Sequence, residues 1–273
     1  MAEPRNATTR GGQRFYTWRD ENYYSATTMI NGGLPKPALI NWAKKFTAIY
    51  AVEHLPALTA LVEDDPDGAI DWLKNAAWRD RDKKAELGTY LHEAVEAYVL
   101  GKPFPEWKPE ARAKMEQFER FLADFQPVFE MTEASVYNRT HRYAGTLDAI
   151  IMLGHEVPRT SLILDMKSGK DIYPEVALQL AMYRHAEFIG LPDGSEQPMP
   201  KVDGACALHL ADHDYKLVDV DAGEEVFRYA MHVREVYRWK LEVEKHVLRG
   251  PLRITNDGVA EMGQMLLGAE KEV

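Results

Sequence analysis

Cysteine is nearly absent from this sequence: its 273 residues include one, Cys206. A lone thiol excludes an intramolecular disulfide, and it excludes any zinc site or iron–sulfur cluster built from several thiolates. The lack of disulfides is typical of a reducing compartment, so we expect a cytoplasmic protein. Cys206 lies between two alanines in an expected strand, where it is predicted to be an inert buried thiol.

Long hydrophobic runs are missing as well. No apolar segment approaches the roughly 20 residues that a membrane-spanning helix needs. The first residues, MAEPRNATTRGGQ, lack the apolar core of a signal peptide. We therefore expect no membrane partner.

The sequence also lacks an excess of positive charge, since 33 Lys and Arg against 43 Asp and Glu give a formal net charge of −10. Taken alone, this balance argues against a nucleic-acid partner. The basic residues nevertheless gather in short segments at Lys44-Lys45, Arg79 to Lys84, Arg139 to Arg142 and Lys167 to Lys170. If these segments converge on one cleft, an acidic protein can still hold a phosphate backbone locally.

The apolar pattern divides the chain into a helical part and an α/β part. Residues 1–22 are expected to be a flexible lead-in, residues 23–126 a helical lobe, residues 127–250 an α/β core and residues 251–273 a C-terminal tail. Helices are expected at 36–54, 85–100, from 109, at 174–189 and at 224–248, and strands at 132–137, 143–152, 162–166, 205–210 and 215–220. The predicted fold class is α/β, with a central mixed sheet flanked by helices and a helical N-terminal lobe, in one domain over residues 23–273.

Two aspartates and a lysine stand out in the expected core. Asp148 lies in an otherwise apolar strand, and Asp165 and Lys167 end the next strand. Residues two apart in a strand share a face, and a hairpin of the two strands would bring Asp148 beside Asp165. Two carboxylates suit a hard divalent cation, and a nearby lysine can orient a water molecule and stabilise charge on a phosphoryl group. The alternative interpretation is an exposed ion pair before a Ser-Gly turn.

Further motifs accompany this pair of strands. They are G-x-x-D at Gly145 to Asp148, D-x-K at Asp165 to Lys167, Q-L-x-x-Y at Gln179 to Tyr183 and G-x-x-x-H-x-x-x-E at Gly88 to Glu96. In this order they resemble the PD-(D/E)XK nuclease superfamily, in particular its RecB-type and CRISPR-associated exonuclease branch. With the segment YYSATTMINGGLPKPALINWA, the resemblance covers roughly residues 24–185.

The resemblance implies a restriction-endonuclease-like core and a set of site residues. The implied catalytic residues are Asp148, Asp165, Lys167, Gln179 and Tyr183. The implied metal ligands are His92, Asp148, Asp165 and the backbone carbonyl of Met166, with Glu133 as a candidate for a second ion. Gln179 and Tyr183 would contact DNA phosphate or hold the strands of the site. The alternative is that His92 is a core histidine and that Gln179 and Tyr183 are ordinary helix residues.

The sequence departs from the family pattern at three points. Leu147 stands where the motif name has proline, and Asp165 replaces the commoner glutamate. Many relatives also clamp the domain with a four-cysteine iron–sulfur cluster, which Cys206 alone cannot form. The resemblance therefore implies Mg²⁺ or Mn²⁺, as one or two ions, and no iron–sulfur cluster, as in phage-type exonucleases.

The function implied by the resemblance is a metal-dependent DNA exonuclease in phage or bacterial recombination or repair, acting in the host cytoplasm if phage-encoded. Two alternatives stay open: an endonuclease of the same fold, and a nuclease-like module that binds nucleic acid or protein without cutting. The expected partner is DNA, and the resemblance also implies a single-strand-annealing protein or a helicase as a possible partner. The oligomeric state is left open. Trp78, in the basic stretch up to Arg81, is a candidate for stacking on single-stranded DNA.

Overall fold

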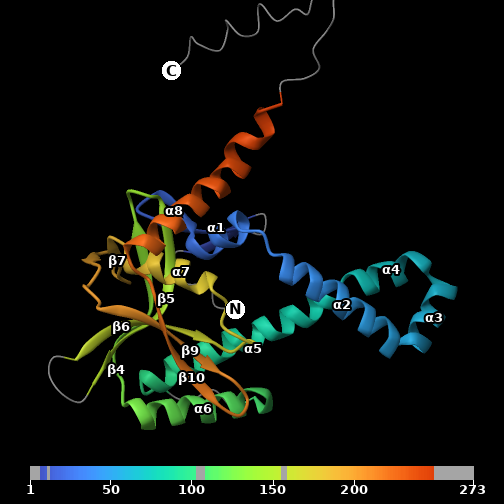
Figure 1. Ribbon diagram of the computed structural model, residues 1–273, viewed down its shortest axis with the longest axis horizontal. Coiled ribbons are helices and arrows are strands. Elements are labelled where there is room, and N and C mark those ends of the chain that lie inside the picture. Colours follow the sequence, from blue (N-terminus) through green and yellow to red (C-terminus); the bar gives the residue numbers. More distant parts are fainter. Residues whose placement is uncertain (1–6, 11–12, 103–107, 155–158, 249–273) are drawn as a thin grey trace, which may run out of the picture.

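The computed structural model describes residues 7–10, 13–102, 108–154 and 159–248 of the chain. Within them, a curled, mixed ten-stranded sheet lies between two groups of helices, and a helical arm projects from one side (Figure 1). This arrangement confirms the predicted α/β class with a central mixed sheet flanked by helices.

Strand β5 (Tyr143–Leu153) is the centre of the sheet. It pairs antiparallel along its length with β4 (Val128–Asn138), and its second half pairs antiparallel with β6 (Thr160–Lys167). Strand β6 runs parallel to β9 (Gly204–Leu210), which forms a hairpin with β10 (Tyr215–Val220). Each strand expected in the core is therefore present.

Residues 7–10 and 13–25 extend this sheet, so the prediction of a flexible lead-in over residues 1–22 is wrong for 7–10 and 13–22. Strands β1 (Ala7–Arg10), β2 (Gln13–Trp18) and β3 (Glu21–Ser25) pair antiparallel, and β3 then joins the start of β5 in parallel. Their buried side chains form an aromatic cluster with the neighbouring edge of the sheet, composed of Tyr16, Trp18, Tyr23, Tyr137 and Phe188. Burial of these large rings stabilises a segment whose polar composition suggested disorder.

Short strands β7 (Phe188–Gly190) and β8 (Glu196–Pro198) were not expected from the sequence. Strand β7 pairs with β4, and helix α7 (Glu175–Arg184) therefore ends before residue 189, where the prediction had placed its end. The chain has to leave the helix here to add a strand to the sheet.

Helices cover both faces of the sheet (Figure 1). Helices α5 (Ala76–Val99) and α6 (Pro109–Phe125) pack on one face, around a core that includes Ile151 and Leu164. Helices α1 (Ala26–Gly33), α7 and α8 (Glu224–Arg238) pack on the other face, around a core that includes Leu147 and Ile163. Helix α8 continues as a π turn (Trp239–Val243) and a 3₁₀ turn (Glu244–His246).

The arm is built from α2 (Pro37–Glu53), α3 (Leu55–Asp64), α4 (Pro66–Lys74) and the first turns of α5 (Figure 1). No residue of α2 or α3 is buried. The arm is held together by stacked and tilted rings, namely Trp42, Phe46, Tyr50, His54 and Trp72. Helix α5 begins at Ala76 rather than at residue 85, so that it runs from the arm into the body.

Cys206 is buried, as predicted, and burial raises the pKa of its thiol to about 12, which keeps it protonated at neutral pH. Among the described helices, none is both long and apolar enough to cross a membrane. The expected tail over residues 251–273 lies outside the described residues.

The close contact between α1 and α8 leads to a prediction for Gly33. A Cβ atom at Gly33 would lie 2.5 Å from the backbone oxygen of Val233 in α8, so Gly33→Ala has to push the two helices apart. We expect a loss of about 1–3 kcal/mol in the free energy of unfolding, measured by urea denaturation. Gly169→Ala is the control, because a Cβ there meets nothing within 4 Å. Equal stability of the two variants would contradict this packing.

Candidate metal centre and active site

The β5–β6 hairpin places the two predicted aspartates beside each other. The pair Ala149–Leu164 ends the regular register, and the next position along the hairpin brings Asp148 opposite Asp165. The backbone N–H of Met166 donates a hydrogen bond to Asp148 Oδ2 at 2.6 Å, which fixes this carboxylate beside the end of β6. The expected hairpin is therefore confirmed.

Glu133 reaches the same place from β4. Its neighbours pair with β5 as Thr132–Ala149 and Ala134–Leu147, so Glu133 lies across from Asp148. Its φ of 48° is left-handed, a conformation that costs a glutamate of the order of 1 kcal/mol or more. Backbone strain of this kind is frequent at functional sites.

The side-chain alternation of β5 changes phase at Asp148. Leu147 packs into the core under α7, whereas Ala149 packs into the core under α5, although residues two apart in a regular strand share a face. This irregularity lets groups from both faces of the sheet approach Asp148 and Asp165.

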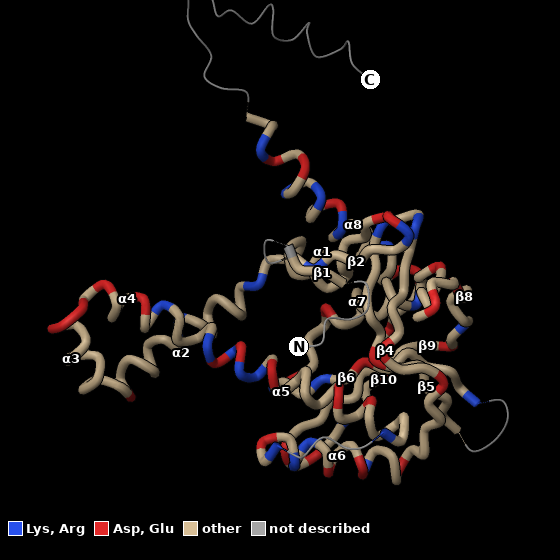
Figure 2. The backbone as a smooth tube through the Cα atoms, turned by 180° about the vertical axis from the view of Figure 1, so that it is seen from behind, with Lys and Arg blue, Asp and Glu red and all other residues tan. Residues whose placement is uncertain are grey.

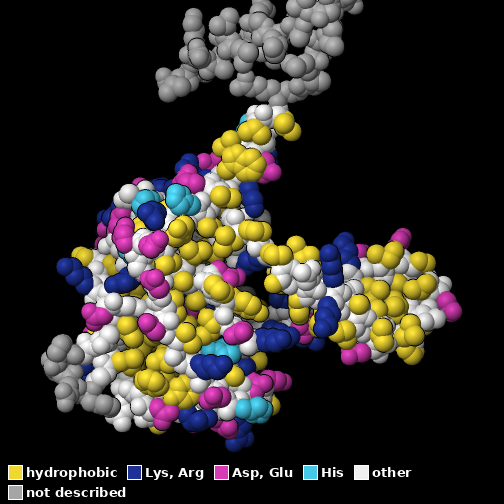
Figure 3. Space-filling view, in the orientation of Figure 1, with side chains coloured by type: hydrophobic (Ala, Val, Ile, Leu, Met, Phe, Trp, Pro, Cys, Tyr) yellow, Lys and Arg dark blue, Asp and Glu magenta, His cyan; other side chains and the backbone are white. Residues whose placement is uncertain are grey.

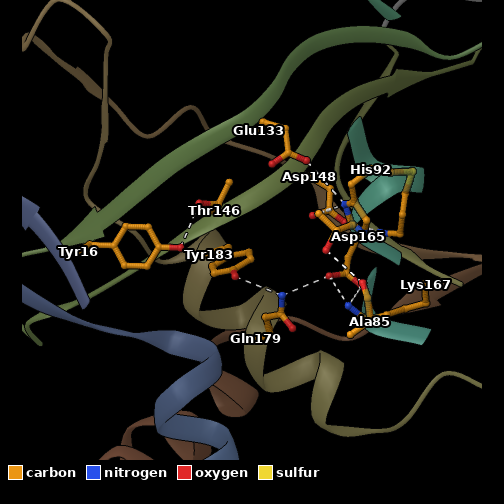
Figure 4. A network of polar contacts seen from close by, with 12 residues as sticks. Tyr16, Ala85, His92, Glu133, Thr146, Asp148, Asp165, Lys167, Gln179 and Tyr183 are labelled. Carbon is orange, nitrogen blue, oxygen red and sulfur yellow. Dashed lines mark hydrogen bonds and ion pairs between the residues drawn. The ribbon is translucent and has the colours of Figure 1, made fainter. Parts of the chain in front are cut away.

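His92 approaches from α5 on one face. Its Nδ1 lies 3.4 Å from Asp148 Oδ1 and 3.6 Å from Glu133 Oε1 (Figure 4). Buried Leu91, next to it on the helix, fixes α5 against the sheet. Ligand atoms of His92, Glu133 and Asp148 all lie within 4.8 Å of one another, so this cluster could hold a metal ion. A small pocket beside it has Glu96 of the histidine motif in its wall.

Lys167, Gln179 and Tyr183 surround Asp165 on the other face (Figure 4). Lys167 Nζ lies 2.8 Å from Asp165 Oδ1 and 2.7 Å from Oδ2. Gln179 Nε2 donates to Asp165 Oδ1 and to the Tyr183 hydroxyl, at 3.2 Å each. The buried Oδ2 atom has the Lys167 ammonium as its ion-pair partner, and no further hydrogen bond from the described residues is directed at it. Because a carboxylate oxygen carries two lone pairs, the ion pair with Lys167 leaves one of them for a further cation.

Gly145 of the G-x-x-D motif allows Tyr183 to lie against the sheet. A Cβ atom at this position would come within 2.3 Å of Tyr183 Cε1. Any larger residue would displace the ring that orients Gln179. Beyond Tyr183, the hydroxyl of Tyr16 lies 3.1 Å from Thr146 Oγ1. The sequence analysis did not single out Tyr16. The alternation of buried Tyr16 and Trp18 with more exposed residues was the available signal for strand β2.

Charge and burial shift the pKa values of these groups. The Asp148 carboxylate raises the pKa of His92 to about 9, against the opposing effect of burial, and Glu133 adds to the rise. Burial and the Asp148 charge raise the pKa of Asp165 to about 6. Burial lowers the pKa of Lys167, but Asp165 and Asp148 outweigh it, and the net shift is upward. Without a metal ion, the protonated side chains of His92 and Lys167 balance the negative charge of the clustered carboxylates.

The structure thus brings together the eight residues singled out from the sequence, with two differences in detail. Glu133, expected to serve a second ion, joins His92 and Asp148 in one cluster, while Asp165 turns to Lys167. Met166 contacts Asp148 through its N–H, and the role of its carbonyl stays a prediction.

The basic segments do not all converge on this site. Arg139 and Arg142, in the β4–β5 turn, pair with Glu196 and Glu21 at the other end of these strands. Figure 2 shows basic and acidic residues alternating along α5, the helix that carries His92.

Comparison with known proteins does not assign the chain to a family. No protein-family model matches the sequence, and no curated protein matches it significantly.

The raised pKa of His92 can be tested in the metal-free protein. Because its folded pKa lies above the unfolded value of about 6.5, the interaction stabilises the fold fully below pH 6.5 and is lost as the pH rises through about 9. An NMR titration of the imidazole in EDTA should give an apparent pKa near 9. In Asp148→Asn the value should fall, because the largest cause is removed. A wild-type value below 7 would contradict this electrostatic account.

Proposed function

We propose that this protein is a metal-dependent deoxyribonuclease that hydrolyses phosphodiester bonds. The observation that carries the proposal is the convergence of Asp148, Asp165 and Lys167 at the end of one hairpin, with His92 and Glu133 beside them. An exposed ion pair, the alternative interpretation of the D-x-K segment, does not fit Asp165, which is 2% exposed.

The donor set suits a divalent cation. Carboxylate oxygens are the ligands that Mg²⁺ and Mn²⁺ prefer, and Glu133 and Asp148 would hold the ion together with the His92 imidazole. Such an ion supplies positive charge for phosphate oxygens and acidifies a water molecule at neutral pH.

The chain's own residues would supply the remaining functions. Lys167 stays protonated beside Asp165, and with 35% of its side chain exposed it can meet a phosphate oxygen and stabilise the charge that develops there. Gln179 holds the Asp165 carboxylate, and Tyr183 holds Gln179. His92 must lose its proton to act as a ligand, so metal binding would release a proton below about pH 9.

DNA as the substrate, and attack from a strand end, are supported by the resemblance to RecB-type exonucleases rather than by the site itself. The same resemblance supports a role in phage or bacterial recombination or repair. Linear and circular DNA separate an exonuclease from an endonuclease of the same fold, because an exonuclease needs an end.

The proposal predicts the behaviour of Asp165→Asn and Lys167→Ala. Both should keep the fold but lose at least about 100-fold in the rate of Mg²⁺- or Mn²⁺-dependent degradation of linear DNA, because transition-state charge is no longer stabilised. Asp219→Asn and Lys216→Ala, exposed on β10, are the matched controls and should retain the activity. EDTA should abolish it.

Two results would overturn the proposal. The first is wild-type activity in Asp165→Asn. The second is tight DNA binding by the wild-type protein with no metal-dependent cleavage, which would favour a non-cleaving nuclease-like module.

A further inference from the structure

We propose that one face of α5 is a binding track for a single DNA strand, with a base-stacking subsite at Trp78 and Arg81. The α5 track consists of Trp78, Arg81, Ala85, Gly88 and His92. The inference rests on the proposed nuclease function, because the track leads to the carboxylate site. It adds the path of the DNA strand between Trp78 and His92.

The spacing of the track residues places them on one stripe. They follow one another at intervals of three, four, three and four residues, and α5 is helical from Ala76 to Val99. Such intervals keep side chains on the same face of a helix. With a rise of about 1.5 Å per residue, Trp78 lies roughly 21 Å along the axis from His92. A stacked strand with a rise of about 3.4 Å per nucleotide spans this distance in about six nucleotides.

The stripe is exposed at Trp78, Arg81 and Ala85 and partly covered at Gly88 and His92, where it meets the strands of the site. None of the five track residues is buried, whereas Tyr90, Leu91, Ala94 and Val95 of the same helix are buried in the core. The small residues lie where the track passes the D-x-K strand: a Cβ atom at Gly88 would lie 3.4 Å from Ser168 Oγ, and Ala85 lies beside Lys167 (Figure 4). A strand on this stripe would therefore pass Lys167 before it reaches His92.

The far end of the track has the composition of a stacking subsite. The Arg81 guanidinium lies 4.8 Å from the centroid of the Trp78 ring, and Trp78 is 37% exposed. Because the guanidinium covers one face of the ring, a base would stack on the other face or take the place of Arg81, which would then meet a phosphate. Arg81 also pairs with Asp82 at the surface, a contact that costs little to exchange for phosphate. Stacking requires an unpaired base, so the subsite fits a single strand.

The charge around Trp78 favours nucleic acid over a second protein. Between residues 79 and 84, four basic residues stand against two acidic ones, a local excess of two positive charges in a chain of net charge −10. Lysine and arginine side chains gather where the arm meets the body, next to the notch between them (Figure 3). A phosphate backbone is the partner that complements this arrangement.

The test measures binding and cleavage of the same oligonucleotide. A fluorescein-labelled oligo(dT) of about 20 nucleotides is titrated with protein in EDTA, and fluorescence anisotropy gives its Kd; Mn²⁺ is then added and cleavage is followed. Trp78→Ala should weaken binding by about 5- to 150-fold, the range for one lost base stack. KM should rise by a similar factor while kcat is kept. Trp78→Phe should retain most of the affinity, and Arg81→Ala should weaken binding and reduce its salt dependence.

Trp239→Ala is the matched control, because Trp239 is also exposed, at 45%, but lies beyond α8. It should bind and cleave like the wild type, and circular dichroism should show all four variants folded. Blunt duplex DNA should respond less to Trp78→Ala than oligo(dT) does.

Unchanged oligo(dT) binding and KM in Trp78→Ala, with wild-type cleavage intact, would overturn the track and leave the proposed function standing. A Trp78→Ala variant that binds DNA normally but changes from dimer to monomer in gel filtration would also overturn it, since a second copy would then cover this face. Absence of cleavage by the wild type would instead overturn the proposed function, while loss of oligo(dT) binding in Trp78→Ala would still support the stacking subsite.

Discussion

The register of the β5–β6 hairpin is the constraint on which the rest of the site depends. It sets Asp148 opposite Asp165 at the point where regular pairing ends, and it turns Asp165 toward Lys167 and Gln179. A slip of one residue would move the Asp165 side chain to the other face of the sheet. The apolar side chains on both faces of β6, such as Ile163 and Leu164, oppose that slip because they fill two separate cores.

Asp148 and Asp165 are largely removed from water, so their negative charges need nearby positive charges or hydrogen bonds. His92 pairs with Asp148 from one face of the sheet, and Lys167 pairs with Asp165 from the other. The change in side-chain alternation at Asp148 allows the two cations to approach from opposite faces. Glu133 adds a third carboxylate at the expense of a strained backbone, which is hard to explain by stability alone. The arrangement is therefore better explained as a binding site than as a structural ion-pair network.

Sequence reasoning reached the central residues because local patterns determine them. One apolar strand contains Asp148 and the next one carries Asp165 near its end, a pattern that predicts a hairpin. The pairing of the hairpin then places the two carboxylates side by side. The N-terminal strands were missed, since their stability comes from long-range aromatic packing between Trp18 and Phe188 rather than from composition. The place of Glu133 depends on a left-handed residue within a strand, which no periodicity indicates.

The central claim is that this cluster binds a divalent ion where DNA would be cut. The most direct measurement is an anomalous difference map from a crystal soaked in millimolar Mn²⁺. The account predicts a peak between the side chains of His92, Glu133 and Asp148, next to Asp165, that disappears in Asp148→Asn. A map with no peak at this cluster, or with Mn²⁺ bound only elsewhere on the protein, would contradict it.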